Sequence, residues 1–146
     1  MNPLLDTVVD FPKGIEQVPY WKVDEVWEWA APLVQKALGV QDEWTLDSVY
    51  RKLVNSDDSM PFQLWVIPKT GAIVTQIQTF PTGVRKCLLF LGGGTSLDQS
   101  LHTHAKIEEW ARKFRGCTKM VIYGRRGWLK VLDGYSEKTV IMERQL

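Results

Sequence analysis

Three consecutive glycines, Gly92, Gly93 and Gly94, followed by Thr95 and Ser96, form the segment of this 146-residue chain best suited to binding an anion. The segment directly precedes a predicted helix. Glycine lets a ligand approach the backbone closely, and a helix N-terminus presents free N–H groups and a positive dipole end. The two hydroxyls can cap the helix or donate to a phosphate. The segment is a candidate anion site, the alternative being a glycine-rich turn without a ligand.

A second candidate site for an anion or an acidic partner is the pair Arg125 and Arg126, which is followed by Trp128. The pair occupies a predicted turn after a strand, where guanidinium groups can bind a phosphate or a carboxylate through two parallel hydrogen bonds. The alternative is a solvated rim in which an arginine stacks on the tryptophan ring.

The histidines and cysteines of the sequence predict neither a metal site nor thiol chemistry. His102 and His104 lie two positions apart on a predicted helix, and residues so spaced point in different directions. Cys87 and Cys117 each lie in or beside an apolar run. We expect both to be small buried side chains in a reducing compartment.

Composition limits the classes of function and location. The N-terminal residues lack the basic and apolar regions of a signal peptide, and no apolar run approaches the ~20 residues of a membrane span. We therefore expect a protein that stays in the cytoplasm or is packaged from there. The net charge of +1 argues against general nucleic-acid binding.

Charge is unevenly divided along the chain. Residues 1–83 hold 6 Lys and Arg against 11 Asp and Glu, a net of −5, whereas residues 84–146 hold 12 against 6, a net of +6. Such asymmetry indicates a basic face for anions or an acidic partner. The alternative is that the two halves pack together and neutralise each other.

The first half of the chain contains two predicted helices. Apolar residues recur at helical spacing from Val23 to Leu38, with Pro32 expected to kink or split that helix. Thr45 is a predicted N-cap of a second helix, which carries Ser48 in its first turn. A short strand is expected earlier, around residues 7–11.

The sequence of the second half of the chain predicts an alternation of strands and helices. Three strands joined by short turns form an antiparallel meander, and a strand–helix–strand unit then implies a parallel pair with a right-handed crossover. The fold class is therefore α/β (α+β), with a mixed sheet, helices on both faces and a single domain over residues 1–146. The predicted strands are 62–68, 72–80, 84–91, 119–123 and 139–143, and the helices are 97–114 and 125–132.

This order resembles the GNAT (Gcn5-related N-acetyltransferase) fold. The string EEWARKFRGCTKMVIYGRRGWLKVLDGY is also similar to a group of small phage-encoded GNAT-like proteins, some of which are virion components. The residues that carry this closer resemblance are Trp110, Ala111, Gly116, Cys117, Gly124, Arg125, Gly127 and Trp128.

The resemblance implies a site for acetyl-CoA or CoA. The backbone amides of residues 87–91, Leu89 and Leu91 among them, would bind the pantetheine arm where two parallel strands separate. The pyrophosphate would bind at residues 92–96. The family's usual loop, (Gln/Arg)-x-x-Gly-x-(Gly/Ala), is not matched by GGGTSLDQS.

The resemblance also implies a general acid, a Tyr about four residues before a closing Gly-aromatic pair. Gly134 and Tyr135 are similar to that pair, but Lys130 occupies the expected position. Tyr123 is the nearest other phenol and is the weak candidate for the catalytic acid.

Two functions remain open. The first is an acetyl-CoA-dependent N-acyltransferase with a degenerate cofactor loop. The second is an inactive GNAT-fold protein of a phage, acting in the particle or on a host protein. It would be located in the host cytoplasm or packaged in a virion, without specific nucleic-acid or membrane binding. Its candidate contact surface contains Glu25, Trp27, Glu28 and Trp29.

Overall fold

The computed structural model describes residues 15–39, 41–55, 61–94, 97–123 and 132–146. One five-stranded sheet organises these residues, in the spatial order β1-β2-β3-β4-β5. The first four strands are antiparallel to their neighbours, and β5 is parallel to β4. The strands are β1 (Glu16–Val18), β2 (Phe62–Ile67), β3 (Gly71–Thr79), β4 (Arg85–Gly94) and β5 (Lys119–Ile122).

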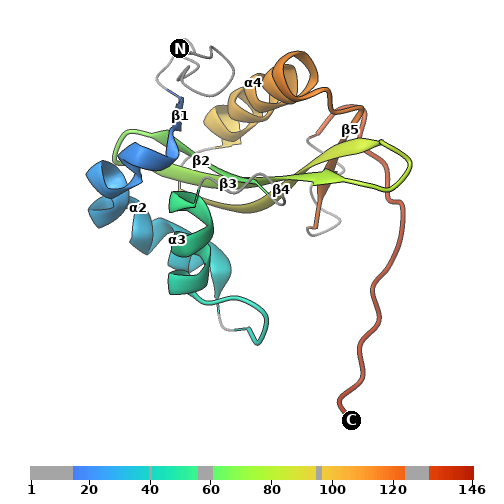
Figure 1. The fold of residues 1–146 in the computed structure, drawn as a ribbon, viewed down its shortest axis with the longest axis horizontal. Coiled ribbons are helices and arrows are strands. Elements are labelled where there is room, and N and C mark those ends of the chain that lie inside the picture. The colour runs from blue at the N-terminus through green and yellow to red at the C-terminus, as the bar shows by residue number, and fades with distance from the viewer. Residues whose placement is uncertain (1–14, 40, 56–60, 95–96, 124–131) are drawn as a thin grey trace.

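Helices cover both faces of this sheet, which confirms the predicted fold class (Figure 1). The helices α2 (Val23–Leu38) and α3 (Leu46–Val54) lie on one face, together with the short 3-10 helix η1 (Tyr20–Lys22). The helix α4 (Leu97–Arg115) lies on the other face, where it connects the parallel strands β4 and β5. No helix in the described ranges combines the length and apolar character that a bilayer crossing requires.

Both predicted N-terminal helices are confirmed. Pro32 lies inside α2 without splitting it. The loss of one backbone hydrogen bond at a proline is offset there by the burial of an apolar stripe that includes Ala30, Val34 and Leu38. The second helix begins after Thr45, as predicted, and Ser48 completes a capping box with it.

Each face of the sheet has its own hydrophobic core because side chains alternate along a strand. In β2, Leu64 and Val66 pack with α2 and α3, whereas Trp65 between them packs with α4. The ring of Trp65 meets that of Trp110 edge to face, with centroids 4.9 Å apart. The sheet is thus buried on both sides and rigidly positions the strand ends beyond it.

The elements at the two ends of the chain differ from the sequence prediction. The first strand is β1, which the sequence analysis missed, and the strand expected at residues 7–11 lies outside the described residues. The helix expected at residues 125–132 also lies outside them, apart from Leu132.

The strand predicted at residues 139–143 is wrong, because the structure has no strand there. This segment runs away from the sheet toward the C-terminus (Figure 1), with Val140, Ile141 and Met142 exposed. The sequence has strand-forming residues, but a strand exists only where a neighbour supplies hydrogen bonds, and no described segment pairs with this one.

Candidate functional site

Strand β5 ends partway along its parallel neighbour β4. Their pairing begins at Lys86 opposite Lys119 and ends at Leu89 opposite Ile122. Strand β4 nevertheless continues for five more residues, 90–94, of which 91–94 pair with β3 and none pairs with β5. The β5-facing edge of this stretch therefore offers backbone N–H and C=O groups to a ligand.

A β-bulge in β4 lies where its pairing with β5 ends. Val74 of β3 lies opposite Leu91, but the next residue, Thr75, lies opposite Leu89, so that Phe90 is the extra residue. A bulge bends its strand and increases its twist. The bulge therefore lies directly after the last residue of β4 that pairs with β5, at the start of the stretch that β5 leaves unpaired. We call the space beside that stretch the gap.

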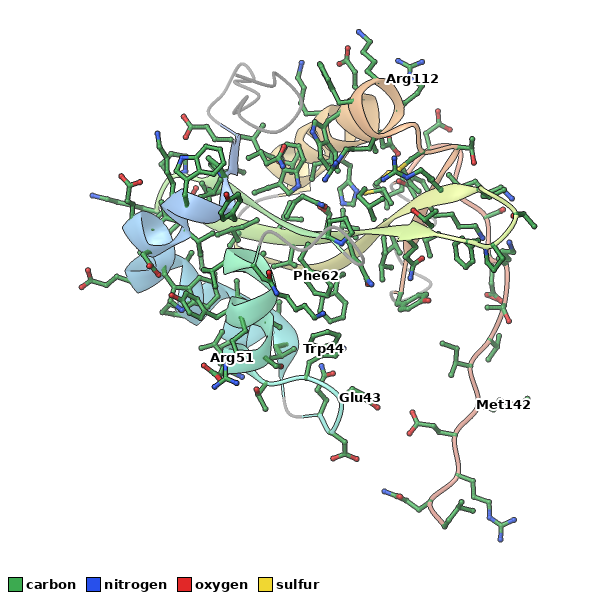
Figure 2. All side chains as sticks on the ribbon, in the orientation of Figure 1. Glu43, Trp44, Arg51, Phe62, Arg112 and Met142 are labelled. Atoms are coloured by element: carbon green, nitrogen blue, oxygen red, sulfur yellow. The ribbon has the colours of Figure 1, made fainter. Side chains whose placement is uncertain are left out.

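Aromatic packing fixes the bulge from the α3 side of the sheet. The ring of Phe90 lies 5.3 Å from that of Trp44 and 5.7 Å from that of Phe62, both edge to face. Trp44 and Phe62 lie on that side of the sheet in Figure 2. Trp44 directly precedes the N-cap of α3, so the second helix and the strand end are positioned by the same cluster.

The three glycines belong to strand β4 itself and not to a turn after it. Gly92, Gly93 and Gly94 pair with Ile73, Ala72 and Gly71 of β3. The predicted strand end at residue 91 is corrected to Gly94, because pairing to β3 on one side suffices to keep the backbone extended. A Cβ added to Gly92 would meet its nearest neighbour at an ordinary 3.8 Å.

The predicted cofactor residues consequently lie in two different environments. Leu89 belongs to the last pair between β4 and β5, and its side chain contributes to the core beside α4. Leu91 and the glycines lie beyond that pair, so residues 90–94, more than 87–89, face the gap. Thr95 and Ser96 lie outside the described residues, and α4 begins directly after them.

Tyr123 lies at the mouth of this gap. It directly follows Ile122, the last residue of β5, and its side chain is 62% exposed. The structure thus places a solvent-accessible phenol directly after the last residue of β5 that pairs with β4. The arginine pair Arg125 and Arg126, with Trp128, lies outside the described residues.

The other phenol considered, Tyr135, has a contact that the sequence did not reveal. Its hydroxyl donates a hydrogen bond of 2.6 Å to the Glu108 carboxylate on α4. Burial, together with this hydrogen bond, strongly raises the pKa of Tyr135. Tyr135 therefore retains its proton and attaches the C-terminal segment to α4, and Gly134 permits the turn before it with a φ of 81°.

The thiols and the histidine of this region are buried. Burial is the largest cause that raises the pKa of Cys87, to about 12, and it also raises the pKa of Cys117. The prediction of small buried cysteines is confirmed. His104 is buried on α4, and the described part of the chain contains no group of three or more His, Cys, Asp or Glu that could hold a metal.

Comparison with known proteins identifies the fold. No protein-family model matches the sequence, and no curated protein matches it. Solved structures do match. A GNAT family acetyltransferase of Staphylococcus aureus is 11% identical, with a TM-score of 0.63 over 90% of this chain and 97% of that chain. The chain has the GNAT fold.

Two further GNAT-fold structures support the same assignment. Aminoglycoside N-acetyltransferase AAC(6')-Iy, solved in complex with CoA, is 14% identical, with a TM-score of 0.59 over 92% of this chain and 98% of that chain. A ribosomal-protein-alanine N-acetyltransferase from Brucella melitensis biovar Abortus is 13% identical, with a TM-score of 0.58 over 89% and 98%. At these identities the likeness concerns the fold, and the closer resemblance to phage proteins stays a prediction.

Proposed function

We propose that this chain binds acyl-CoA in the gap between β4 and β5 and transfers the acyl group to an amine. The observation that carries the proposal is the stretch of residues 90–94, extended and unpaired toward β5 among the described residues. An exposed strand edge binds an extended amide-containing chain as if it were an added strand. Pantetheine is such a chain.

The surroundings of this edge fit the rest of the cofactor. Strand β4 leads to the N-terminus of α4, where backbone N–H groups and the helix dipole favour a phosphate. Gly92 is exposed and has no Cβ to obstruct the edge. The described residues therefore suit both the amide-rich arm and the charged end of CoA.

Catalysis would need little from the protein beyond positioning and one proton. Bound acyl-CoA would supply an activated thioester to the attacking amine. Tyr123, exposed at the mouth of the gap, is the phenol that we propose as proton donor to the departing sulfur. Tyr135 is unsuited to this role because its hydroxyl is committed to Glu108.

A second function is favoured by two departures from the family's pattern. The segment GGGTS lacks the long polar residue that begins the family's phosphate loop, and Lys130 stands where the family has its tyrosine. These departures favour a GNAT-fold protein without catalysis, acting in a phage particle or on a host protein. Its tryptophans Trp27 and Trp29 are half-buried against the core, with Glu25 and Glu28 exposed beside them.

Thermal unfolding with and without ligand separates the two functions. A ligand at one hundred times its dissociation constant stabilises the folded state by ~2.7 kcal/mol. We expect acetyl-CoA and CoA to raise the melting temperature and acetate to leave it unchanged. Absence of any shift at millimolar CoA would favour the non-catalytic function.

Variants at Gly92 test whether the ligand binds at the proposed edge. Gly92→Asp places a bulky anion beside the phosphates and should abolish the shift, whereas Gly92→Ala should fold normally because its Cβ meets only ordinary contacts. Retention of the full shift in Gly92→Asp would place CoA elsewhere. Where release of CoA thiol with an amine is detectable, Tyr123→Phe should lower kcat roughly 100-fold without reducing the thermal shift.

A further inference from the structure

Two lysine side chains lie side by side where the parallel strands β4 and β5 begin. Lys86 of β4 pairs with Lys119 of β5, and neighbouring strands lie about 4.8 Å apart. The next pair along these strands, Cys87 and Met120, packs in the core beside α4. Because side chains alternate along a strand, both lysines are directed to the other face of the sheet, the face of α2 and α3.

A third lysine reaches this place from the C-terminal part of the chain. The hydroxyl of Tyr135 is bonded to Glu108 on α4. From there the chain passes the end of the sheet and continues to the side of α2 and α3 (Figure 1). Lys138 lies on this path, within hydrogen-bonding reach of the Lys86 amine. The attachment of Tyr135 to α4 therefore helps to keep a third ammonium group beside the other two.

An aromatic ring borders the three amines. Phe80, which follows β3, is 40% exposed, and the Lys86 Nζ lies over its ring at 5.1 Å from the centroid. A cation over an aromatic face is favoured electrostatically, so the ring helps to fix the position of this amine. We call Phe80, Lys86, Lys119 and Lys138 the lysine cluster.

The lysine cluster gathers positive charge without a counter-charge among the described residues. The hydrogen bond and the charge of Lys138 are the largest causes that lower the pKa of the Lys86 amine, and partial burial and the charge of Lys119 act in the same direction. No carboxylate of the described chain is among these causes, and no ion pair printed for the described residues includes a member of the cluster. Like charges so placed repel one another, and an anion between them would remove that repulsion.

The number of charges indicates the class of anion. A single carboxylate would balance only one of the three ammonium groups, whereas one phosphate monoester carries a charge of about −2 at neutral pH, and a chain of phosphates carries more. Lysine binds phosphate as a compact point charge with three donors. The lysine cluster therefore suits a ligand with two or more phosphate groups better than it suits a carboxylate.

The lysine cluster is far from the part of the proposed CoA site that would bind phosphate. At about 3.3 Å per residue, strand β4 advances about 25 Å from Lys86 to Gly94. The helix α4, whose N-terminus would bind the phosphates of CoA, begins only after that residue, at Leu97. A phosphate ligand on the lysine cluster would therefore occupy a second site.

We propose that the lysine cluster binds a polyphosphate group, either that of a nucleotide or an inorganic polyphosphate chain, independently of acyl-CoA. The three ammonium groups would contact the phosphate oxygens, and the exposed ring of Phe80 would lie beside the ligand. Such a site would also account for part of the excess of basic residues in the second half of the chain.

Titration calorimetry of the full chain with inorganic tripolyphosphate tests the site. We expect binding by the wild type. Lys86→Gln and Lys138→Gln should each raise the dissociation constant roughly tenfold, because each removes one charged contact. Lys22→Gln is the matched control, since it makes the same change in net charge at an exposed position on η1, after β1 at the opposite edge of the sheet. It should bind as the wild type does.

Thermal unfolding separates a role in binding from a role in folding. Without ligand, Lys138→Gln should melt no lower than the wild type, because the amine that it removes is repelled by Lys86. With tripolyphosphate, its melting temperature should rise less than that of the wild type. Sodium chloride at the same ionic strength should not reproduce the rise.

ATP beside tripolyphosphate distinguishes the two sources of the phosphate group. Tighter binding of ATP, lost in Phe80→Ala, would support the proposal with a nucleotide as the ligand, because an aromatic ring can stack on a base. Equal binding of the two would support it with an inorganic polyphosphate as the ligand.

The Gly92→Asp variant keeps this proposal apart from the proposed CoA site, because it should lose the CoA shift and still bind tripolyphosphate. Loss of tripolyphosphate binding in Gly92→Asp would place that ligand at the CoA edge and overturn the proposal. Absence of binding, equal affinities of Lys138→Gln and Lys22→Gln, or a thermal shift reproduced by sodium chloride would also overturn it. Binding of polyglutamate in place of tripolyphosphate would do the same and would assign the cluster to an acidic protein.

Discussion

At the scale of single residues, the Thr75 hydroxyl is a buried polar group with two hydrogen-bond partners. It accepts a hydrogen bond of 3.0 Å from the Trp65 indole and donates one of 2.7 Å to the Gln63 side-chain carbonyl. All three residues are buried on the sheet. The hydroxyl therefore links a donor to an acceptor that water cannot reach. Thr75 lies opposite Leu89, the residue that precedes the bulged Phe90.

Replacing Thr75 with valine should destabilise the fold by about 1–3 kcal/mol, because a buried donor and a buried acceptor both lose a partner. Thr75→Ser is the control, since it keeps the hydroxyl and removes one methyl group at a cost of about 0.8 kcal/mol. Urea unfolding of the two variants measures the difference. Equal stabilities would mean that the hydrogen bonds contribute nothing beyond packing.

The buried His104 side chain is expected to make the folding stability depend on pH. Burial lowers the pKa of this imidazole below its ordinary 6.5, although the charge of Glu108 acts in the opposite direction. Between 6.5 and the lower folded value, the unfolded chain binds the proton and the folded chain does not, so stability falls as the pH falls through this window. His104→Gln should lose less stability than the wild type between pH 7 and pH 5, measured by urea midpoints. Parallel losses would contradict this role.

At the scale of elements, α3 depends on its capping box. The Ser48 backbone N–H donates to the Thr45 side chain at 3.1 Å, and the Thr45 backbone N–H donates to the Ser48 side chain at 2.8 Å. Both bonds satisfy groups that a helix start leaves without partners. Because Trp44 immediately precedes this cap, the cap also positions the ring that supports the bulge at Phe90.

Thr45→Ala should therefore cost about 1 kcal/mol of stability, while Thr45→Ser should cost much less because it keeps the accepting oxygen. Chemical denaturation gives both values. If CoA binding is established, the alanine variant should also weaken it slightly through Trp44. A stability equal to that of the wild type would show that α3 is held by its packed face alone.

At the scale of the whole molecule, one sheet carries a hydrophobic core on each of its faces. The proposed CoA site lies where β4 continues beyond the last residue that pairs with β5. Packing on both faces therefore positions the strand end at which the ligand would bind.

The amino-acid sequence by itself determined the helices α2, α3 and α4 and the strands β2 to β5, because apolar periodicity and turn residues act within a few positions of one another. It also determined their order, from which the GNAT resemblance followed. Strand β1 was missed because three residues are too few to display a period.

The tertiary structure alone decided how far each strand remains paired. Pairing of β4 with β5 ends at Leu89, the glycines stay in the strand, and the segment at 139–143 finds no neighbour. The contact between Tyr135 and Glu108 likewise joins residues 27 positions apart. Local sequence states which backbone conformation a segment prefers, but hydrogen-bond partners across a sheet depend on which distant segments meet, and that is fixed only when the whole chain packs.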